Sequence, residues 1–128
     1  MAIIKSYTSL EQSKKLSEIL PLESADMYWW YSGKRYYIEA IDDGDFNEKG
    51  DIRAWSLSAL LDVLPNNEHI ETAISRGSWK IDPVEYLPNT WWCEYEDTKN
   101  QTEFNISASN PLDACYKMIL NLHELNLL

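Results

Sequence analysis

The stretch Trp91-Trp92-Cys93-Glu94-Tyr95-Glu96 decides the fold class, because the character of its side chains alternates along the chain. Successive side chains of a β-strand point to opposite faces, so the alternation predicts a strand with one buried and one open face. The buried face is predicted to hold Trp91, Cys93 and Tyr95, and the open face Trp92, Glu94 and Glu96. Phe104 and Ile106 are typical of a return strand, so the region is predicted to form a hairpin.

The strongest helix signal follows directly after this hairpin. Asn110 suits an N-cap, Pro111 suits the first helical position, and Asp113 complements the positive end of a helix. Apolar residues then recur at helical spacing, and the predicted buried stripe consists of Leu112, Cys115, Ile119 and Leu122. The sequence therefore predicts an amphipathic helix that lies across the sheet.

Two further helices are predicted earlier in the chain. Ser9 followed by Gln12 forms a capping-box pattern, which indicates the start of a helix. A second helix is predicted to begin at Ser56 or Ser58, because leucines follow at the i, i+3, i+4, i+7 spacing of one helical face. These leucines are Leu57, Leu60, Leu61 and Leu64.

Two other regions are typical of paired strands. Residues 28–41 are aromatic and β-branched around Ser32-Gly33-Lys34, which predicts a hairpin with a short glycine-containing turn. In its return strand, the inward side chains are predicted to be Tyr36, Ile38 and Ala40, and the outward ones Tyr37 and Glu39. Residues 69–81 predict two short strands on either side of Arg76-Gly77.

Together these elements predict an α+β fold. We expect an antiparallel β-sheet of about four to six short strands, packed with two or three amphipathic helices. The chain has 128 residues and a hydrophobic fraction of 45%, which is enough to bury a core without a disulfide or a metal. Residues 1–128 are therefore expected to form a single domain.

The charge of the chain argues against several classes of ligand. Eleven Lys and Arg stand against 21 Asp and Glu, which gives a formal net charge of −10 at pH 7. Such a charge opposes direct nucleic-acid binding and attachment to anionic lipid surfaces. No signal-peptide pattern and no apolar run of about 20 residues is found. We therefore expect a cytoplasmic protein with no membrane partner, whose Cys93 and Cys115 are buried, reduced thiols.

Sequence motifs for catalysis, metal binding or phosphate binding are weak or absent from the chain. Asp43, Asp45 and Asn47 imitate the opening of a calcium loop, but Glu48 stands where glycine is needed and Ala54 where the bidentate glutamate belongs. The histidines and cysteines lack the close spacing of strong metal sites, and neither a nucleophile elbow nor a glycine-rich phosphate loop is found. We assign no catalytic residue, no cofactor and no metal site, and we expect a protein that is not an enzyme.

The chain is unusually rich in aromatic residues, with six Trp and eight Tyr in an acidic sequence. Adjacent strand positions point to opposite faces, so each Trp-Trp pair is predicted to place one ring outside. Exposed Trp and Tyr often anchor protein interfaces, because they bury a large area at small entropic cost. The candidate protein-binding residues are Trp92, Tyr37 and one ring of Trp29 or Trp30.

Three stretches carry a resemblance to known proteins: 110–115 with 118–119 and 122–124, 54–61, and 20–27. In sequence they read Asn-Pro-Leu-Asp-Ala-Cys, Met-Ile and Leu-His-Glu; Ala-Trp-Ser-Leu-Ser-Ala-Leu-Leu; and Leu-Pro-Leu-Glu-Ser-Ala-Asp-Met. They resemble small uncharacterised proteins of gut Bacteroidales genomes and their prophage-like regions. That group has no established activity, so the resemblance implies a bacterial or phage accessory protein and assigns no functional residue.

Three functions are compatible with these observations. The first is a protein-binding module whose exposed aromatic patch has an acidic rim and contacts another protein or a second copy of the chain. The second is an acidic mimic of DNA that occupies the basic groove of a nucleic-acid-binding protein. The third is carbohydrate or small-molecule binding by exposed aromatic rings, to which a pair of carboxylates would add hydrolysis.

Overall fold

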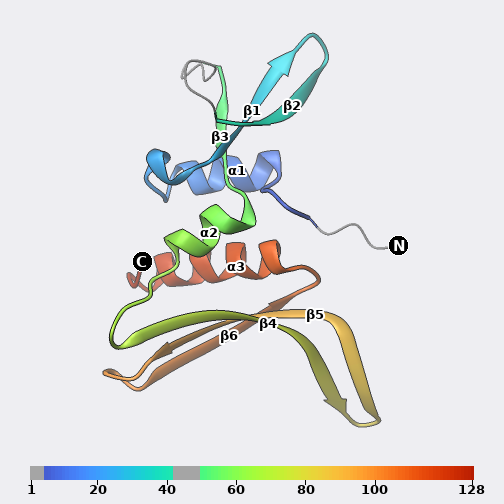
Figure 1. Ribbon diagram of the computed structural model, residues 1–128, viewed down its shortest axis with the longest axis vertical. Helices are drawn as coiled ribbons and strands as arrows, with labels where there is room; N and C mark the ends of the chain where they lie inside the picture. The colour runs from blue at the N-terminus through green and yellow to red at the C-terminus, as the bar shows by residue number, and fades with distance from the viewer. Residues whose placement is uncertain (1–4, 42–49) are drawn as a thin grey trace. The chain divides into compact units, whose positions relative to one another are not determined.

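The computed structural model describes residues 5–41 and 50–128, and these residues form an α+β fold (Figure 1). They contain six β-strands and three α-helices, and all the paired strands are antiparallel. The α+β class predicted from the sequence is confirmed. The strands divide between two three-stranded sheets, whereas the sequence led us to expect one sheet.

The chain divides into two compact units, Ser6–Val63 and Leu64–Leu128, with Lys5 belonging to the second. Each unit contains one of the two sheets. That the whole chain is one domain stays a prediction. The acidic residues of the imitated calcium loop, Asp43, Asp45 and Asn47, lie outside the described residues.

The unit Ser6–Val63 contains α1 (Leu10–Ser17), the 3-10 helix η1 (Leu22–Ser24), β1 (Met27–Ser32), β2 (Arg35–Ala40), β3 (Ile52–Ala54) and α2 (Leu57–Val63). Its sheet has the strand order β2-β1-β3. The predicted capping box starts α1. Ser9 Oγ accepts a hydrogen bond from the backbone N–H of Gln12 at 3.1 Å, and Gln12 Oε1 accepts one from the backbone N–H of Ser9 at 3.0 Å. Two backbone donors at the helix start are thereby satisfied.

The second helix starts after Ser56, one of the two predicted positions. Ser56 Oγ accepts a hydrogen bond from the backbone N–H of Ala59 at 3.2 Å. The Asp26 carboxylate in turn accepts hydrogen bonds from the backbone N–H and the hydroxyl of Ser56. The leucine stripe is narrower than predicted, because Leu60 is fully buried but Leu61 is 40% exposed.

Strands β1 and β2 form the hairpin predicted for residues 28–41, with Gly33 in the turn at a φ of 67°. The predicted burial of its return strand is wrong at three positions, while Glu39 is exposed as predicted. Tyr36 is 38% exposed and Ala40 is also exposed, while Tyr37, predicted outward, is half-buried. One reason is that β2 is an edge strand. In addition, β3 pairs only with the first half of β1, so Tyr36 at the far end of the hairpin has no third strand beside it.

The unit Leu64–Leu128 contains β4 (Ile70–Ile81), β5 (Val84–Asp97), β6 (Thr102–Ala108) and α3 (Pro111–Glu124). Its sheet has the order β4-β5-β6, and α3 packs against β5 and β6 on one face (Figure 1). The predicted N-cap is confirmed, because Asn110 Oδ1 accepts a hydrogen bond from the backbone N–H of Asp113 at 2.8 Å. The predicted stripe is fully buried: Leu112, Cys115, Ile119 and Leu122.

The alternation predicted for β5 is confirmed from Cys93 to Glu96, whereas Trp91, predicted to be buried, and Trp92 are both half-buried. Cys93 and Tyr95 are 0% and 1% exposed, whereas Glu94 and Glu96 are exposed. The Tyr95 ring lies 5.6 Å from the ring of Phe104 in β6, centroid to centroid. We call the side of this sheet under α3 the covered face and the opposite side the open face.

The prediction of two short strands in residues 69–81 is wrong. β4 runs through this region as one strand, and it pairs with β5 along its whole length apart from a register shift near Gly77. The reason is that Gly77 lies in an irregularity opposite residues 88–90 rather than in a turn. The chain reverses only at Asp82-Pro83, a cis peptide.

Candidate functional site

Strands β4 and β5 continue beyond the end of β6 as a two-stranded hairpin, residues 78–87, which we call the arm (Figure 1). At its base, Gly77 of β4 lies opposite residues 88–90 of β5. One of these is Pro88, which lacks the backbone N–H that a strand ladder uses. Extra residues in one strand bend a strand pair, and Figure 1 shows the arm bending away from α3.

Side chains fix the base of the arm. Gly77 has a φ of 92°, and a Cβ at this position would overlap Tyr86 Oη, so glycine allows the Tyr86 ring to lie against the backbone. Arg76 Nε donates a hydrogen bond to the carbonyl oxygen of Pro88 at 2.9 Å. The Arg76 guanidinium also lies 5.4 Å from the centroid of the Trp91 ring.

One side of the arm is entirely apolar. Trp79 pairs with Tyr86 and Ile81 with Val84, and the two aromatic rings lie 5.1 Å apart. The exposed fractions are 66% for Trp79, 85% for Ile81, 78% for Val84 and 47% for Tyr86. Apolar side chains gathered in this way are typical of surfaces that bind other molecules.

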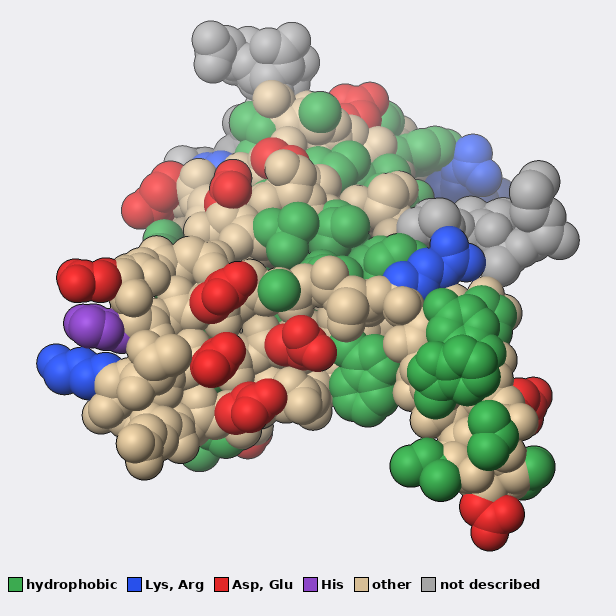
Figure 2. All heavy atoms as spheres, turned by 60° about the horizontal axis from the view of Figure 1, so that its bottom comes forward, with side chains coloured by type: hydrophobic (Ala, Val, Ile, Leu, Met, Phe, Trp, Pro, Cys, Tyr) green, Lys and Arg blue, Asp and Glu red, His purple; other side chains and the backbone are tan. Residues whose placement is uncertain are grey.

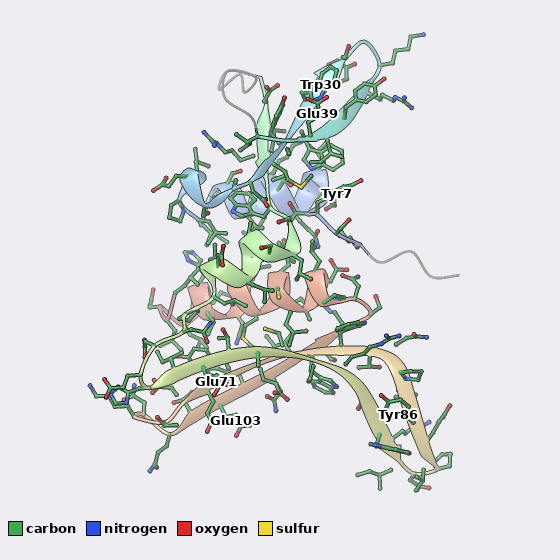
Figure 3. All side chains as sticks on the ribbon, viewed as in Figure 1. Tyr7, Trp30, Glu39, Glu71, Tyr86 and Glu103 are labelled. Carbon is green, nitrogen blue, oxygen red and sulfur yellow. The ribbon has the colours of Figure 1, made fainter. Side chains whose placement is uncertain are left out.

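The open face of the sheet is acidic. Glu71, Glu96 and Glu103 form a row of directly paired residues across the three strands, and Glu94 lies in the next row. All four side chains are exposed, and Figure 3 shows Glu71 and Glu103 on the side of the sheet opposite α3. Like charges on directly opposite strand positions are destabilising. We therefore expect the row to lower the stability of the free protein.

The acidic row and the apolar side of the arm face the same side of this unit. Along β4, Trp79 and Ile81 are separated from Glu71 by even numbers of residues, and the residues inserted at the bend belong to β5. Figure 2 shows acidic side chains over the sheet and hydrophobic side chains on the arm in one view. We call the set the acidic-apolar surface: Glu71, Glu94, Glu96, Glu103, Trp92, Trp79, Ile81, Val84 and Tyr86.

Trp92 is the one sequence-predicted site residue within this surface. It lies on the open face between Ser75 and Ser107, and its side chain is half-buried. Glu94 and Glu96 share its face, as the alternation predicted. Along β5, Trp92 therefore lies between the acidic row and the arm.

The other predicted site residues lie in the unit Ser6–Val63. Trp30 and Tyr37 are paired across β1 and β2, and their rings are stacked at 4.9 Å with an interplanar angle of 25°. Trp29 points to the opposite face of the hairpin, where its Nε1 donates to the backbone oxygen of Thr8 at 3.1 Å and its ring meets Tyr7 edge-on at 5.7 Å. Trp29 thus has a structural role, while Trp30 and Tyr37 form a half-buried ring pair.

The four apolar residues of the arm are not among the binding residues predicted from the sequence. The signal was present, since Trp79 and Ile81 before the Asp82-Pro83 turn match Val84 and Tyr86 after it. The intervening positions carry Lys80 and Glu85, which face each other across the arm. A period of two on both sides of a two-residue turn is the pattern of a hairpin with one apolar side.

The turn between β5 and β6 is held by Asp97. Its carboxylate accepts hydrogen bonds from the Asn100 side chain at 2.8 Å and from the backbone N–H groups of Lys99 and Asn100 at 3.0 and 3.2 Å. These hydrogen bonds, led by that from the Asn100 side chain, hold the pKa of the Asp97 carboxyl below its usual value.

A shallow hollow of about 320 Å³ lies beside this turn, lined by Glu96, Asp97, Thr98, Gln101, Thr102 and Glu103. None of its lining residues is aromatic. The hollow therefore gives no support to carbohydrate binding by stacked rings.

The two cysteines, both fully buried, come from α3 and from the covered face of β5. A hydrogen bond between the two thiols, together with burial, raises the pKa of Cys115. A thiol held in its neutral form is a poor nucleophile and a poor metal ligand. Among residues 5–41 and 50–128, no group of three His, Cys, Asp or Glu side chains is placed to hold a metal ion.

In the described part of the chain, no helix has the length and apolar character required to cross a membrane. Comparison with known proteins adds no assignment. No protein-family model matches the chain, and no match is found among curated proteins or solved structures.

Proposed function

We propose that this chain is a non-enzymatic protein-binding module, and that the acidic-apolar surface is its main contact surface. The observation that carries the proposal is the arm, on which four apolar side chains are 47–85% exposed, although β5, one of its two strands, has buried side chains under α3. An arm of this kind contributes little to folding, so its apolar character is available for recognition.

The composition of the arm suits a binding anchor. Complete burial of a Val, Ile or aromatic side chain contributes roughly 1.5–3 kcal/mol. Trp and Tyr are enriched among the residues that dominate interface energies. The Trp79 and Tyr86 rings lie 5.1 Å apart, and the Tyr86 ring lies against the backbone of Gly77. These contacts order the rings in the free protein, which lowers the entropy lost on binding.

Within this proposal, Trp92 extends the apolar anchor toward the acidic row. Trp30 and Tyr37 offer a second aromatic pair, next to which the Arg35 guanidinium lies 4.7 Å from the Tyr37 ring. A cytoplasmic location belongs to the same proposal. The resemblance to proteins of prophage-like regions makes bacterial and phage proteins the first partners to examine.

The proposal is tested by affinity capture with matched variants. The tagged wild-type protein, a Trp79→Ser/Tyr86→Ser variant and a Trp92→Ala variant are compared in an extract of the native host. The control is Leu22→Ser/Leu61→Ser, because these leucines are also exposed, at 45% and 40%, but lie in the other unit. A specific partner is expected with the wild type and the control, and its recovery is expected to fall with the arm and Trp92 variants.

Recovery of every partner at the wild-type level by the arm variant would exclude the arm as a contact surface. Light scattering during gel filtration adds a test of self-association, for which the arm variant is expected to change the mass if copies bind each other. A loss of about 3 kcal/mol of stability in Trp92→Ala would identify that ring as core rather than contact.

An acidic DNA mimic is a second candidate, favoured by the row Glu71, Glu96 and Glu103 across neighbouring strands, which lie about 4.8 Å apart. Such a mimic is expected to compete with DNA for a basic protein in a salt-dependent way. Competition that persists in the Trp79→Ser/Tyr86→Ser variant would favour the mimic over a module that needs the arm. If the protein displaces DNA from no basic partner at low salt, the DNA-mimic function is excluded.

A further inference from the structure

We infer that the occupant of the acidic-apolar surface is a segment of a partner protein with clustered lysines or arginines at one end and apolar side chains at the other. This inference rests on the proposed function and adds the chemistry of the partner. It follows from three properties of the surface: its uncompensated charge, its mismatch with a second copy, and the spacing of its two parts.

The charge of the open face is uncompensated. Its remaining residues are uncharged: Ala73, Ser75, Trp92, Asn105 and Ser107. Within the described ranges, none of the four glutamates takes part in a hydrogen bond or an ion pair. Four negative charges therefore lie next to an apolar arm, with no cation on the same sheet face. A partner that brings cations would relieve the repulsion within the Glu71–Glu96–Glu103 row.

The same charge argues against a second copy of the chain as the occupant. Two copies facing each other through this surface would bring together two sets of four carboxylates, each on a chain of net charge −10. Like-charge contact of this kind suppresses association, and at low salt it acts over about 10 Å or more. The occupant must therefore combine apolar side chains for the arm with positive charge for the sheet.

The distance along β5 between the acidic row and the arm sets the length of the partner segment. Glu96 and Trp92 are four residues apart on β5, which corresponds to about 13 Å along a strand, and the arm begins beyond Trp92. The cationic and apolar parts of the occupant must be separated by a similar distance, which about four extended residues span. An apolar segment without cations would engage the arm alone.

The test uses a fluorescent synthetic peptide with lysines in its first half and leucines in its second half. Fluorescence anisotropy measures its Kd for the full-length protein at low and moderate salt. A second peptide, with glutamine in place of lysine, is the charge control. The lysine peptide is expected to bind about tenfold more tightly than the glutamine peptide, and the difference is expected to shrink as salt rises.

Two sets of protein variants locate the binding. One variant neutralises the open face and is expected to raise the Kd of the lysine peptide by about tenfold. It carries four substitutions: Glu71→Gln, Glu94→Gln, Glu96→Gln and Glu103→Gln. The matched control makes the same change of net charge at exposed glutamates elsewhere: Glu11→Gln, Glu18→Gln, Glu23→Gln and Glu124→Gln. That control is expected to change the Kd by less than about twofold, because separated surface charges are screened.

The peptide-binding results test the chemistry of the partner independently of the arm's role as a contact surface. If the lysine peptide does not bind, or if it binds the open-face variant and the control variant equally, the inference about the partner is overturned. The capture experiment with Trp79→Ser/Tyr86→Ser then still decides the proposed function, because it depends on the arm and not on the glutamates. If the arm variant binds the lysine peptide as tightly as the wild type, charge alone explains the binding and the two-part occupant is overturned.

Discussion

The same two strands, β4 and β5, behave differently in the sheet and in the arm. Under α3, Cys93 and Tyr95 of β5 are at most 1% exposed, whereas Val84 of the same strand is 78% exposed. Apolar and polar residues alternate in both regions, so the difference lies in what covers the apolar side. Alternation therefore identifies the apolar side of a strand, but burial requires another element of the chain on that side.

The largest difference between the regions is expected for isoleucine truncation. Ile119 of α3 has no exposed surface, so Ile119→Ala is expected to lower the free energy of unfolding by about 3 kcal/mol. Ile81→Ala in the arm is expected to cost less than about 0.5 kcal/mol, because Ile81 is 85% exposed. Urea unfolding followed by tryptophan fluorescence measures both values, and equal losses would show that the arm is part of the core.

A smaller effect is expected at the base of the arm. Gly77→Ala places a side chain at a φ of 92° and displaces the Tyr86 ring, so a loss of about 1–2 kcal/mol is expected. Gly33→Ala is the matched control, because Gly33 also has a positive φ but no atom lies within 4 Å of its added Cβ. If Gly77→Ala leaves the NMR signals of Tyr86 unchanged, the close contact between glycine and ring does not exist in solution.

Substitution in the acidic row is expected to raise the stability of the protein rather than lower it. Glu96→Gln removes the central charge between Glu71 and Glu103, and a gain of about 0.5 kcal/mol in stability is expected at low salt. The gain is expected to decrease as salt rises. Glu85→Gln on the arm is the control, because Glu85 pairs with Lys80 and its replacement is expected to bring no gain. A destabilised Glu96→Gln protein would mean that the row stabilises the fold.

The smallest expected effect is on the free energy of unfolding at acid pH. It distinguishes the turn between β5 and β6, which contains Asp97, from the turn between β4 and β5, which contains Asp82. Because the pKa of Asp97 is lowered in the folded protein, its contribution to stability is present above its unfolded pKa of about 3.9 and is lost as pH falls through the folded pKa. Asp97→Asn is expected to remove this part of the acid dependence. Asp82→Asn, at the exposed turn of the arm, is the control and is expected to leave it intact. Urea unfolding at a series of pH values measures the difference.

Local signals in the sequence predicted the local structure well. Ser9 with Gln12, Ser56, and Asn110 each mark a helix start, because capping depends on residues only a few positions apart. The alternation from Trp91 to Glu96 predicted both faces of β5 for the same reason. Trp92 could therefore be placed on the open face from sequence alone.

Long-range features could not be predicted in this way. The division of six strands between two sheets depends on contacts between distant residues, which periodicity does not reveal. The sequence predicts a turn at Gly77, because glycine suits a turn and an irregular strand equally well. The row Glu71, Glu96 and Glu103 exists only through strand register, since 25 residues separate the first two in sequence.

The proposed role of the arm requires that its apolar side chains do not hold the fold together. The free energy of unfolding of a variant with Trp79, Ile81, Val84 and Tyr86 all replaced by Ser tests it most directly. A loss of less than about 2 kcal/mol is expected, which is the contribution of two exposed cross-strand pairs. A loss of about 4 kcal/mol or more would contradict the claim, because it would mean that these side chains are buried by the protein itself.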